Sequence, residues 1–519
     1  MNYVGTARPI HDAKGKATGY SKYAGDISLS NMAYLCMLHS KIPHGYVKAV
    51  HAEKALALPG VYGVYHCLNT SERKYNRYRS SFDQAYLANE ERAFNQYVRF
   101  VGDKIGAVAA CDQETAEKAA RLVEVEYEEL SFSIGFDDTL AGKNCLDGET
   151  PVRDEYELDV GEKQGSAEGL IEVCSTMELP RLHHATMETH ACIADYDPYS
   201  DMLTVYCPNQ AVHGIRTVLA DFLEMPESHV RVVKATMGGS FGAKQEWFLE
   251  PVTALVAKKL CRPVKLVYSR GEAMTDTIVR GAMRMSARGY YTPDGEMKEI
   301  YCDVTLDAGA YIGNAGDYVR ALAGKPTRCY RIPYMHYHGQ VISSNSPVSG
   351  AFRSWSAAEE ALMMERQLDA AAEKLGMDRL AIRLKNVARS GEEDKKLHLS
   401  LEDIRIGDAI TLGSEKFGWD KLKAEDAAFN ASQQRYRRGV GIGIGGHGNT
   451  YFPRFNDYGE GSISLNADGS MQANFPLHDH GCGTVTAMRM IAAEVLKVPE
   501  DKIYMTEGDT AVTPIDYGC

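Results

Sequence analysis

The stretch Ala235–Glu246, ATMGGSFGAKQE, constrains the fold more than any other part of this chain. It follows the alternating apolar run HVRVVKAT, and the segment PVTALVAKKL after it has a helical composition with proline at a first turn. A strand, a glycine loop and a helix in this order let backbone N–H groups converge on an anion. A Walker phosphate loop is excluded, because Lys244 is followed by Gln245 instead of serine or threonine. Two interpretations remain: a ligand-binding loop, or a tight turn with Phe241 packed inside.

The bulk composition sets the class of protein. A chain of 519 residues is long enough for about three or four domains. Its 44% hydrophobic and 24% charged residues are typical of a soluble globular protein, and its net charge of -13 argues against a nucleic-acid or anionic membrane partner. No apolar run reaches the roughly 18–20 residues of a membrane span. The 12 cysteines form no CxxC pair, so we expect a cytoplasmic protein with no membrane or nucleic-acid partner.

Strand and helix patterns alternate along the chain, which predicts an α+β (mixed α/β) fold. The segment Asp112–Leu122 is rich in helix formers and has Asp112 at the capping position. VEVEYEEL, which follows, is expected to be a half-buried strand, and the polar stretch from Asp137 to Gly169 has few periodic apolar residues, so we expect a linker there. The predicted regions are a domain at residues 1–140, a linker at 141–170, a domain at 171–395 and a further domain that begins at 396 and runs to 519.

Other patterns predict the elements around and beyond the glycine loop. DMLTVYCPNQ (Asp201–Gln210) is expected to be a strand that leads into a helix, and EGSISLNADGSMQANF near the C-terminus is expected to be a strand. Ser356 and Glu359 have the spacing of a capping box before a helix that Gly376 ends. The helix after Gln210 has one apolar face, made of Ile215, Val218, Leu219, Phe222 and Leu223.

Two histidine-containing segments are candidate metal sites. In HHATMETH, His184 and Glu188 are four residues apart, which suits zinc on a helical face, but the segment is not HExxH. Partly buried polar residues between strands are the favoured alternative. In HDHGCG, His478, His480 and Cys482 alternate and would face one side of a strand. A turn that opens a helix, whose N-terminus binds anions, is at least as good an interpretation.

Taken together, the motifs resemble one family. DAKGKATGYSKYAGD, PGVYGV and the run from VRFVGDK to VEVEYEEL are similar to the opening, hammerhead-like domain of the molybdenum-binding large subunit of the xanthine dehydrogenase and aldehyde oxidase family. HHATMETH, CPNQ, VRVVKATMGGSFGAK, SGAFR and LAIRLKN resemble its molybdopterin-binding core in the same order. The resemblance covers essentially the whole chain. It implies a hammerhead-like domain followed by an incomplete pair of molybdopterin-binding domains.

The resemblance implies a cofactor site with no direct protein ligand to molybdenum, which the pterin holds. Phe241 would pack against the pterin dithiolene and the oxygen ligand of the metal, Gln210 would approach that oxygen, and Arg353 would stand near the metal as a catalytic residue. The HDHGCGT turn lies where the family has a Gly-Gln-Gly turn for the pterin and its phosphates, with Cys482 in place of glutamine. The expected cofactor-binding residues are Gln210, Gly239, Phe241, Gly242, Arg353, Gly481, Cys482, Gly483 and Thr484.

Three substrate contacts follow from the same resemblance. Gln245 stands where xanthine-type members have an acid, so hydrogen bonding is kept and the charge is lost. Arg320 would polarise a carbonyl or a ring nitrogen, although a one-residue insertion lies nearby and a surface ion pair is the alternative. Trp355 offers a flat face for stacking a ring.

The implied reaction is hydroxylation of an N-heterocycle, purine- or xanthine-like, with oxygen from water. The implied cofactor is Mo-molybdopterin in its cytosine dinucleotide form. The family's general-base glutamate, from a GxGE segment, has no counterpart up to Cys519. We therefore expect another polypeptide to complete the molybdenum subunit, an exposed apolar surface where it binds, and [2Fe-2S] and FAD subunits that take the electrons.

Five possibilities remain open at this point. Within the family, the substrate is a purine, a nicotinate-type heterocycle or an aldehyde. Outside it, the chain is a zinc hydrolase built on its His, Glu and Cys clusters, or a non-catalytic scaffold that has kept the fold. The presence of Gln210, Phe241 and Arg353 together argues against the scaffold.

Overall fold

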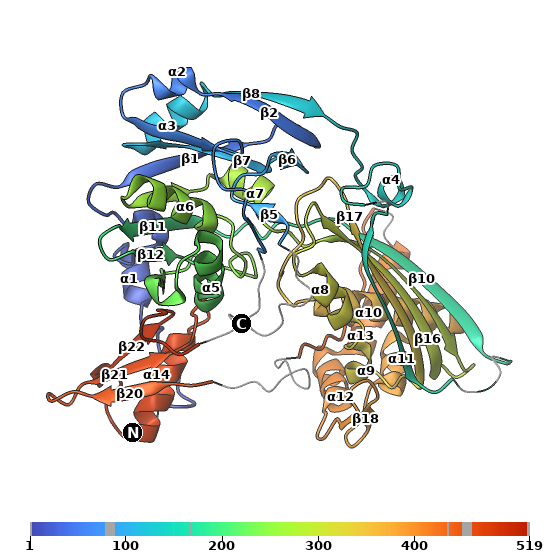
Figure 1. Cartoon of the computed structure of the whole chain (residues 1–519). Coiled ribbons are helices and arrows are strands. Elements are labelled where there is room, and N and C mark those ends of the chain that lie inside the picture. The colour runs from blue at the N-terminus through green and yellow to red at the C-terminus, as the bar shows by residue number, and fades with distance from the viewer. Residues whose placement is uncertain are drawn as a thin grey trace.

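The computed structural model of the chain describes residues 3–77, 89–148, 150–163, 165, 168–432, 435–448 and 459–515. Two large sheets lie side by side, and a smaller body that contains the last strands lies below the left-hand sheet in the first view (Figure 1). The mixed α/β class predicted from the sequence is confirmed. Within the described residues, no helix has the length and apolar character to cross a membrane.

A seven-stranded sheet joins the N-terminal part of the chain to the middle part. Its strand order is β13-β12-β11-β14-β1-β7-β3. The N-terminal strands are β1 (Ala33–His39), β3 (Val61–His66) and β7 (Lys104–Ala110), and the middle strands are β11 (Ala191–Asp197), β12 (Met202–Cys207), β13 (Val230–Lys234) and β14 (Val264–Val267). The two groups meet where β1 pairs in parallel with β14. Because they share one sheet and one core, the first 140 residues do not form a separate layer.

Small elements cover the N-terminal end of this sheet. The helix α3 (Gln113–Ala120) begins as predicted, with the Asp112 side chain accepting a hydrogen bond from the Thr115 amide at 2.7 Å. A second, three-stranded sheet is formed by β6 (Tyr97–Val98), β2 (Gly45–His51) and β8 (Glu124–Glu129). The other short elements of the first 140 residues are α1 (Ala13–Thr18), α2 (Glu53–Leu56), β4 (Lys74–Tyr75), β5 (Glu91–Arg92) and α4 (Phe136–Leu140).

The prediction of a linker at 141–170 is wrong for its central part. Residues Val152–Gly161 form β9, an edge strand of a five-stranded sheet ordered β10-β15-β16-β17-β9. Apolar Tyr156, Leu158 and Val160 alternate with acidic residues, and this period of two was hidden by the overall polarity. The other strands are β10 (Ile171–Leu179), β15 (Ala282–Tyr291), β16 (Met297–Gly309) and β17 (Tyr334–Ser343).

Helices flank the two sheets and carry the loops between them. The helix after Gln210 is confirmed as α5 (Val212–Leu223), with the whole predicted apolar face buried. The capping box before α10 (Ala357–Leu375) is wrong: Ser356 has φ 64° and makes no side-chain cap, and Glu359 instead pairs with Arg280. Gly376 ends this helix as predicted. The others are α6 (Glu250–Leu260), α7 (Arg270–Asp276), α8 (Ala315–Leu322), α9 (Pro326–Cys329) and α11 (Arg379–Asn386).

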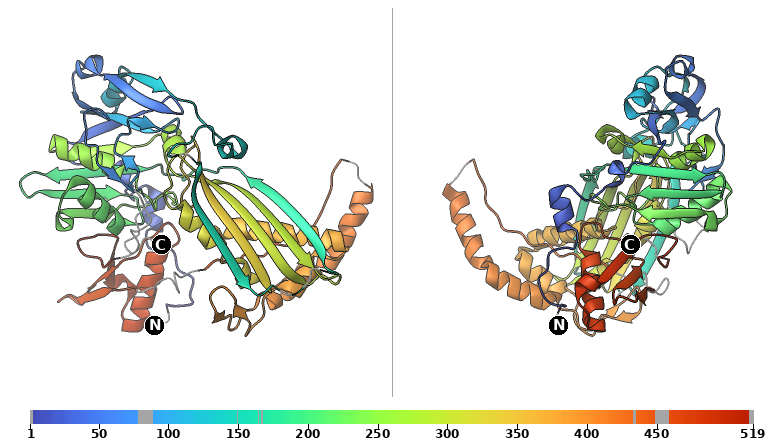
Figure 2. Two further views of the ribbon diagram at one scale, coloured as in Figure 1. Left: turned by 45° about the vertical axis from the view of Figure 1, so that its right-hand side comes forward. Right: turned by 90° about the vertical axis from the view of Figure 1, so that its left-hand side faces the viewer.

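The C-terminal part forms its own small body. The predicted single strand is a hairpin, β20 (Ser462–Leu465) and β21 (Met471–Phe475), and β22 (Ile503–Glu507) pairs in parallel with β21. The helix α14 (Thr484–Leu496) packs on this sheet. Tyr3 inserts into the core of the same body, so the start of the described chain lies against it. Before it, α12 (Ile406–Phe417) and α13 (Trp419–Ser432) are mostly exposed and extend outward (Figure 2).

A buried network of charges joins the N-terminal part to α7. Arg77 and Glu91 form a bidentate pair, and Nζ of Lys104 lies 3.5 Å from Oε2 of Glu91 and 3.4 Å from Oδ1 of Asp276. All four side chains are at most 2% exposed. Lys104 therefore stands between two carboxylates from different parts of the chain.

Replacing Lys104 by methionine should destabilise the protein strongly, because two buried carboxylates lose a shared cation. Breaking a buried pair in this way costs about 3–5 kcal/mol. The matched control is Lys48→Met, which breaks the exposed Lys48–Glu128 pair and should cost at most about 1 kcal/mol. Chemical unfolding of both variants measures the difference. Equal unfolding midpoints would show that the network does not stabilise this junction.

Candidate functional site

The glycine loop between β13 and α6 has a backbone that few residues can adopt. Gly239, Phe241 and Gly242 have φ values of 95°, 55° and 100°. A Cβ atom on Gly242 would lie 2.5 Å from the carbonyl oxygen of Ala351, so only glycine fits there. Phe241 is 53% exposed. This excludes the interpretation of a tight turn with Phe241 packed inside.

A buried ion pair holds the glycine loop in place. Nζ of Lys244, 1% exposed, lies 2.5 Å from Oε2 of Glu188, and the same oxygen accepts the Gly238 amide at 2.7 Å. Burial lowers the pKa of Lys244, and the Glu188 carboxylate opposes that shift. Lys244 is thus a structural anchor of the glycine loop.

The HHATMETH segment serves this anchor instead of a zinc ion. Glu188 is occupied by Lys244 and the loop backbone, and Nε2 of His184 lies 2.8 Å from the Ala351 carbonyl oxygen. Burial lowers the pKa of His184 to about 4, so it is neutral. Across the described ranges, no three His, Cys, Asp or Glu residues are grouped to hold a metal ion.

The structure brings Gln210, Phe241 and Arg353 together. Gln210 follows β12, is 6% exposed, and its Oε1 accepts a hydrogen bond from the hydroxyl of Ser240 at 2.8 Å. Arg353 is exposed, and its amide donates to the Phe241 carbonyl at 2.9 Å. Three segments that are far apart in the sequence therefore meet at the glycine loop.

Two of the predicted substrate contacts lie on the same segments. Gln245 is half-buried, and its backbone amide donates a hydrogen bond to the Gly242 carbonyl at 3.3 Å. Trp355, two residues after Arg353, packs against both large hydrophobic cores, and its ring lies 5.2 Å from that of Tyr318. Trp355 thus stands at the junction of the two cores.

The structure places the third predicted contact, Arg320, in an ion pair at the sheet edge. Its Nη2 donates to Oδ1 of Asp154 on β9 at 2.8 Å, and Nη1 is 2.5 Å from the other carboxylate oxygen. Its guanidinium also lies over the Tyr156 ring. An ion pair of this kind is the alternative to a substrate contact that the sequence analysis named for Arg320.

A buried acid beside the loop was missed by sequence reasoning. Glu246 is fully buried, and Nδ2 of Asn314 donates to its Oε1 at 3.0 Å. Burial raises its pKa to about 8. Xanthine-type members have an acid directly after the loop lysine, where this chain has Gln245, and here an acid comes one residue later. This displaced acid is the signal that the sequence offers.

The HDHGCGT turn differs from the prediction in one respect. The Asp479 carboxylate accepts the Gly481 amide at 2.7 Å and the Gly483 amide at 3.2 Å, so these two donors do not point at a ligand. Cys482 remains exposed, and its Sγ lies 2.9 Å from the hydroxyl of Thr484 at the start of α14. A carboxylate at this position caps the helix N-terminus.

The turn is nevertheless held close to the strand that leads into the glycine loop. Oε2 of Glu507 accepts the Asp479 amide at 2.8 Å and the ammonium of Lys234, the last residue of β13, at 3.0 Å. His480 is neutral, because burial lowers its pKa to about 4. Within the part of the chain that the structure describes, His478, His480 and Cys482 are not grouped to hold a metal ion.

Comparison with known proteins decides the family. The domain described as "Aldehyde oxidase and xanthine dehydrogenase, a/b hammerhead domain" matches residues 18–131, and the molybdopterin cofactor-binding domain matches twice, at 152–387 and 412–519. A probable xanthine dehydrogenase subunit from Bacillus subtilis is 32% identical over 99% of this chain and 67% of its own length. The chain belongs to the xanthine dehydrogenase and aldehyde oxidase family. It is a molybdopterin-dependent oxidoreductase of that type.

Other relatives show how the similarity is distributed. The xanthine dehydrogenase molybdenum-binding subunit of Escherichia coli O157:H7 is 29% identical over 98% of this chain and 68% of its own length. The nicotinate dehydrogenase large molybdopterin subunit of Eubacterium barkeri is 29% identical over 73% of this chain and 88% of its own length. The solved quinoline 2-oxidoreductase of Pseudomonas putida 86 shares the fold, with a TM-score of 0.87 at 23% identity over 98% of this chain and 67% of its own. The hammerhead domain and the molybdopterin-binding domains are thus confirmed in the predicted order.

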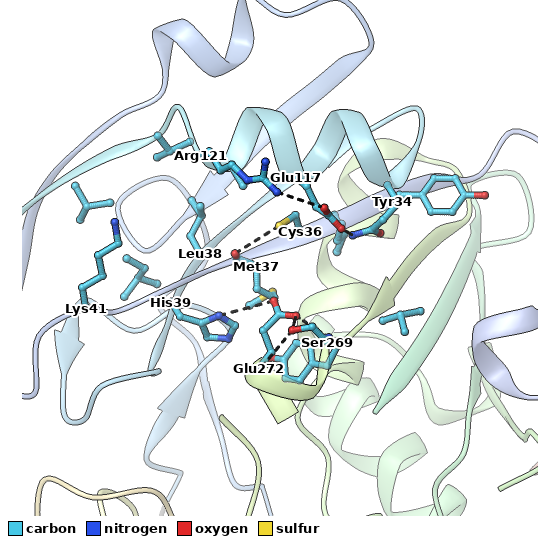
Figure 3. A pocket seen from close by; sticks show the side chains of 18 of the residues that line it. Tyr34, Cys36, Met37, Leu38, His39, Lys41, Glu117, Arg121, Ser269 and Glu272 are labelled. Atoms are coloured by element: carbon cyan, nitrogen blue, oxygen red, sulfur yellow. Dashed lines mark hydrogen bonds and ion pairs between the residues drawn. The ribbon is translucent and has the colours of Figure 1, made fainter. Parts of the chain in front are cut away.

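A large cavity lies elsewhere, between β1, α3 and α7 (Figure 3). Its volume is about 1070 Å³, and no predicted site residue lines it. Several of its charged side chains pair with one another, among them Arg121 with Glu117 and His39 with Glu272. Burial raises the pKa of the Cys36 thiol to about 12, so it is not a reactive thiolate. The cavity does not contribute to the site around Phe241.

Gly242→Ala tests whether the loop geometry is required for the cofactor. Gly242 and Gly376 both have left-handed φ values, but only Gly242 has a backbone atom in the way of a Cβ. Gly376→Ala should therefore cost only the strain of about 1–2 kcal/mol, and Gly242→Ala should cost more and lose most of the bound molybdenum. Unfolding curves and metal analysis of the purified protein measure both effects. Full molybdenum content in Gly242→Ala would contradict the assignment of the loop.

Proposed function

We propose that this chain carries the molybdenum cofactor of a hydroxylase that inserts oxygen from water into a purine- or xanthine-like N-heterocycle. The observation that supports this most directly is the convergence of Gln210, Phe241 and Arg353 around the glycine loop. An exposed phenylalanine at φ 55° is unfavourable in a folded chain unless something covers it. A pterin ring system supplies such a cover.

The residues present fit Mo-molybdopterin. Because Gly242 has no Cβ, the loop backbone lies close to Ala351. The Phe241 side chain is exposed, and the buried side-chain amide of Gln210 accepts a hydrogen bond from Ser240. In this proposal Phe241, Gln210 and Arg353 hold the metal end, with Gly239 and Gly242 supplying the close backbone. When bound, the metal centre activates water and accepts an electron pair from the substrate.

The pterin tail is proposed to be a cytosine dinucleotide that approaches the turn before α14. Because Asp479 occupies the amides of Gly481 and Gly483, this turn would contribute the side chains of the exposed Cys482 and the half-buried Thr484. The negative charge of Asp479 disfavours a phosphate directly on the helix N-terminus. We therefore place the phosphates to one side of the helix axis.

The protein's own part in the reaction is to orient a flat substrate. Trp355 presents an aromatic face, and aromatic stacking adds about 0.5–1.5 kcal/mol beyond burial. Gln245 donates or accepts one hydrogen bond without adding charge. A nicotinate-type heterocycle or an aldehyde is the alternative substrate, since a relative is named nicotinate dehydrogenase and a neighbouring structure is an aldehyde oxidoreductase.

The general base is proposed to come from outside this chain. The two acids next to the loop, Glu188 and Glu246, are engaged by Lys244 and Asn314. Exposed apolar side chains on the C-terminal body support a second polypeptide that completes the molybdenum subunit, among them Leu465 (69%), Val495 (73%) and Tyr504 (70%). We further propose [2Fe-2S] and FAD subunits and a cytoplasmic location, and two relatives are indeed named as subunits.

The proposal is tested on the complex purified from its native source. We expect molybdenum, a cytosine nucleotide released by acid, and ¹⁸O from labelled water in the hydroxylated product with an artificial electron acceptor. Purines, nicotinate and aldehydes are compared as substrates. Zinc without molybdenum in active material would favour the hydrolase, and a lack of turnover in a molybdenum-loaded complex would favour the scaffold.

Replacing Trp355 tests the stacking surface. Trp355→Ala should lower kcat/KM for a heterocycle about tenfold, because the stack is lost, and Trp355→Phe should retain most of it. A short aliphatic aldehyde, which cannot stack, is the internal control. An equal loss for both substrates would mean that Trp355 acts only through the fold.

A further inference from the structure

Three consecutive residues after Arg353 have a left-handed backbone. The φ values of Ser354, Trp355 and Ser356 are 82°, 38° and 64°. A side chain rarely adopts such a conformation, which costs of the order of 1–3 kcal/mol for each residue and persists only where the surroundings impose it. The turn Ser354–Ser356 therefore needs a specific support.

The support is the side chain of Lys325, at the start of α9. Its Nζ donates hydrogen bonds to the carbonyl oxygen of Trp355 and, at 2.8 Å, to the hydroxyl of Ser356. Lys325 is 7% exposed and Ser356 is fully buried. One ammonium group thus binds two adjacent residues of the strained turn.

The other end of the turn is tied to the glycine loop. The Arg353 amide donates to the Phe241 carbonyl, and Nη2 of Arg280 donates to the Arg353 carbonyl at 2.9 Å. Nη1 of Arg280 pairs with Glu359 at 2.5 Å. The turn that contains Trp355 is therefore bonded to the glycine loop at one end and to Lys325 at the other.

We propose that Lys325 is a positioning residue that holds the turn Ser354–Ser356 so that Trp355 presents its ring to a planar nitrogen heterocycle beside Phe241. The inference rests on the function proposed above. Lys325 acts through Trp355. Arg320, the cation that the sequence predicted as a substrate contact, pairs with Asp154 on β9.

The charge on Lys325 gives the support a pH dependence. Burial lowers the pKa of Lys325 to about 8, opposed by Glu360 and Glu359 on α10 and assisted by Arg328 on α9. His447, which also faces it, has its own pKa lowered by burial and by Lys325. Burial raises the pKa of Glu360 to about 8, and neither of its oxygens has a hydrogen-bond partner among the described residues.

The sign of the effect separates positioning from stability. Below about pH 8 the ammonium is present and the turn is held; above it the support weakens. The ordinary pKa of 10.5 applies to the unfolded chain, so between about pH 8 and 10.5 that chain binds more protons and this group's contribution to stability rises with pH. A loss of substrate affinity above pH 8 is then not explained by unfolding from this lysine.

The test compares Lys325→Met, Lys325→Arg and a matched control in the assembled complex. The control is Lys396→Met, because Lys396 is a half-buried lysine whose Nζ makes one long hydrogen bond, to the Arg320 carbonyl at 3.4 Å. KM and kcat are measured for a purine and for a short aliphatic aldehyde. Hydrogen–deuterium exchange of the peptide that contains residues 353–357 is measured on the same samples.

For Lys325→Met we expect a roughly tenfold rise in KM for the purine with kcat within about twofold, because ground-state and transition-state stacking are lost equally. The aldehyde should be unaffected, and exchange in the turn should be faster. Lys325→Arg should restore most of the purine KM and most of the protection from exchange, and Lys396→Met should match the wild type. The wild-type KM for the purine should rise above pH 8, and that of Lys325→Arg should not.

The inference would be overturned if Lys325→Met had the same KM and the same rate of exchange as the wild type. It would also be overturned if KM rose equally above pH 8 in the wild type and in Lys325→Arg. Both proteins are measured in a Glu360→Gln background as well, which removes the neighbouring titration. If the wild-type complex oxidises no heterocycle, the proposed function fails. The exchange comparison then still decides whether Lys325 holds the turn.

Discussion

The ion pair between Lys244 and Glu188 is the interaction on which the site depends. It is buried beneath a loop whose backbone has three left-handed positions and cannot hold its shape alone. Removing one partner of such a pair costs about 3–5 kcal/mol, because the other charge is left buried. The same carboxylate also accepts the Gly238 amide, so charge and backbone are fixed by one group.

Once the loop is fixed, its neighbours are placed in turn. Ser240 orients the Gln210 amide, the Phe241 carbonyl accepts the Arg353 amide, and Ala351 lies where the Cβ of Gly242 would be. Left-handed φ values remain at Phe241 and at the turn Ser354–Ser356, and the two segments are joined by the hydrogen bond from the Arg353 amide to the Phe241 carbonyl. Strained, partly exposed residues in an otherwise close-packed junction are typical of a ligand site.

Local patterns predicted the fold class, α5 and its apolar face, the Asp112 cap and the strand–loop–helix order around the glycines. The ordered motifs predicted the family and the meeting of Gln210, Phe241 and Arg353. Two errors have a common cause, because each required knowledge of a distant partner. Strand β9 needs β17, and Glu359 leaves its cap to pair with Arg280. No local pattern specifies such contacts, and no local pattern predicted that Lys325 supports the turn Ser354–Ser356.

The most direct measurement of the central claim is a cryo-electron microscopy map of the cofactor-loaded complex. The account predicts pterin density in van der Waals contact with the Phe241 ring, about 3.5–4 Å away, with Gln210 and Arg353 at its metal end. The cavity between β1, α3 and α7 should contain no cofactor density. A cofactor in that cavity, or a Phe241 ring covered by a protein side chain, would contradict it.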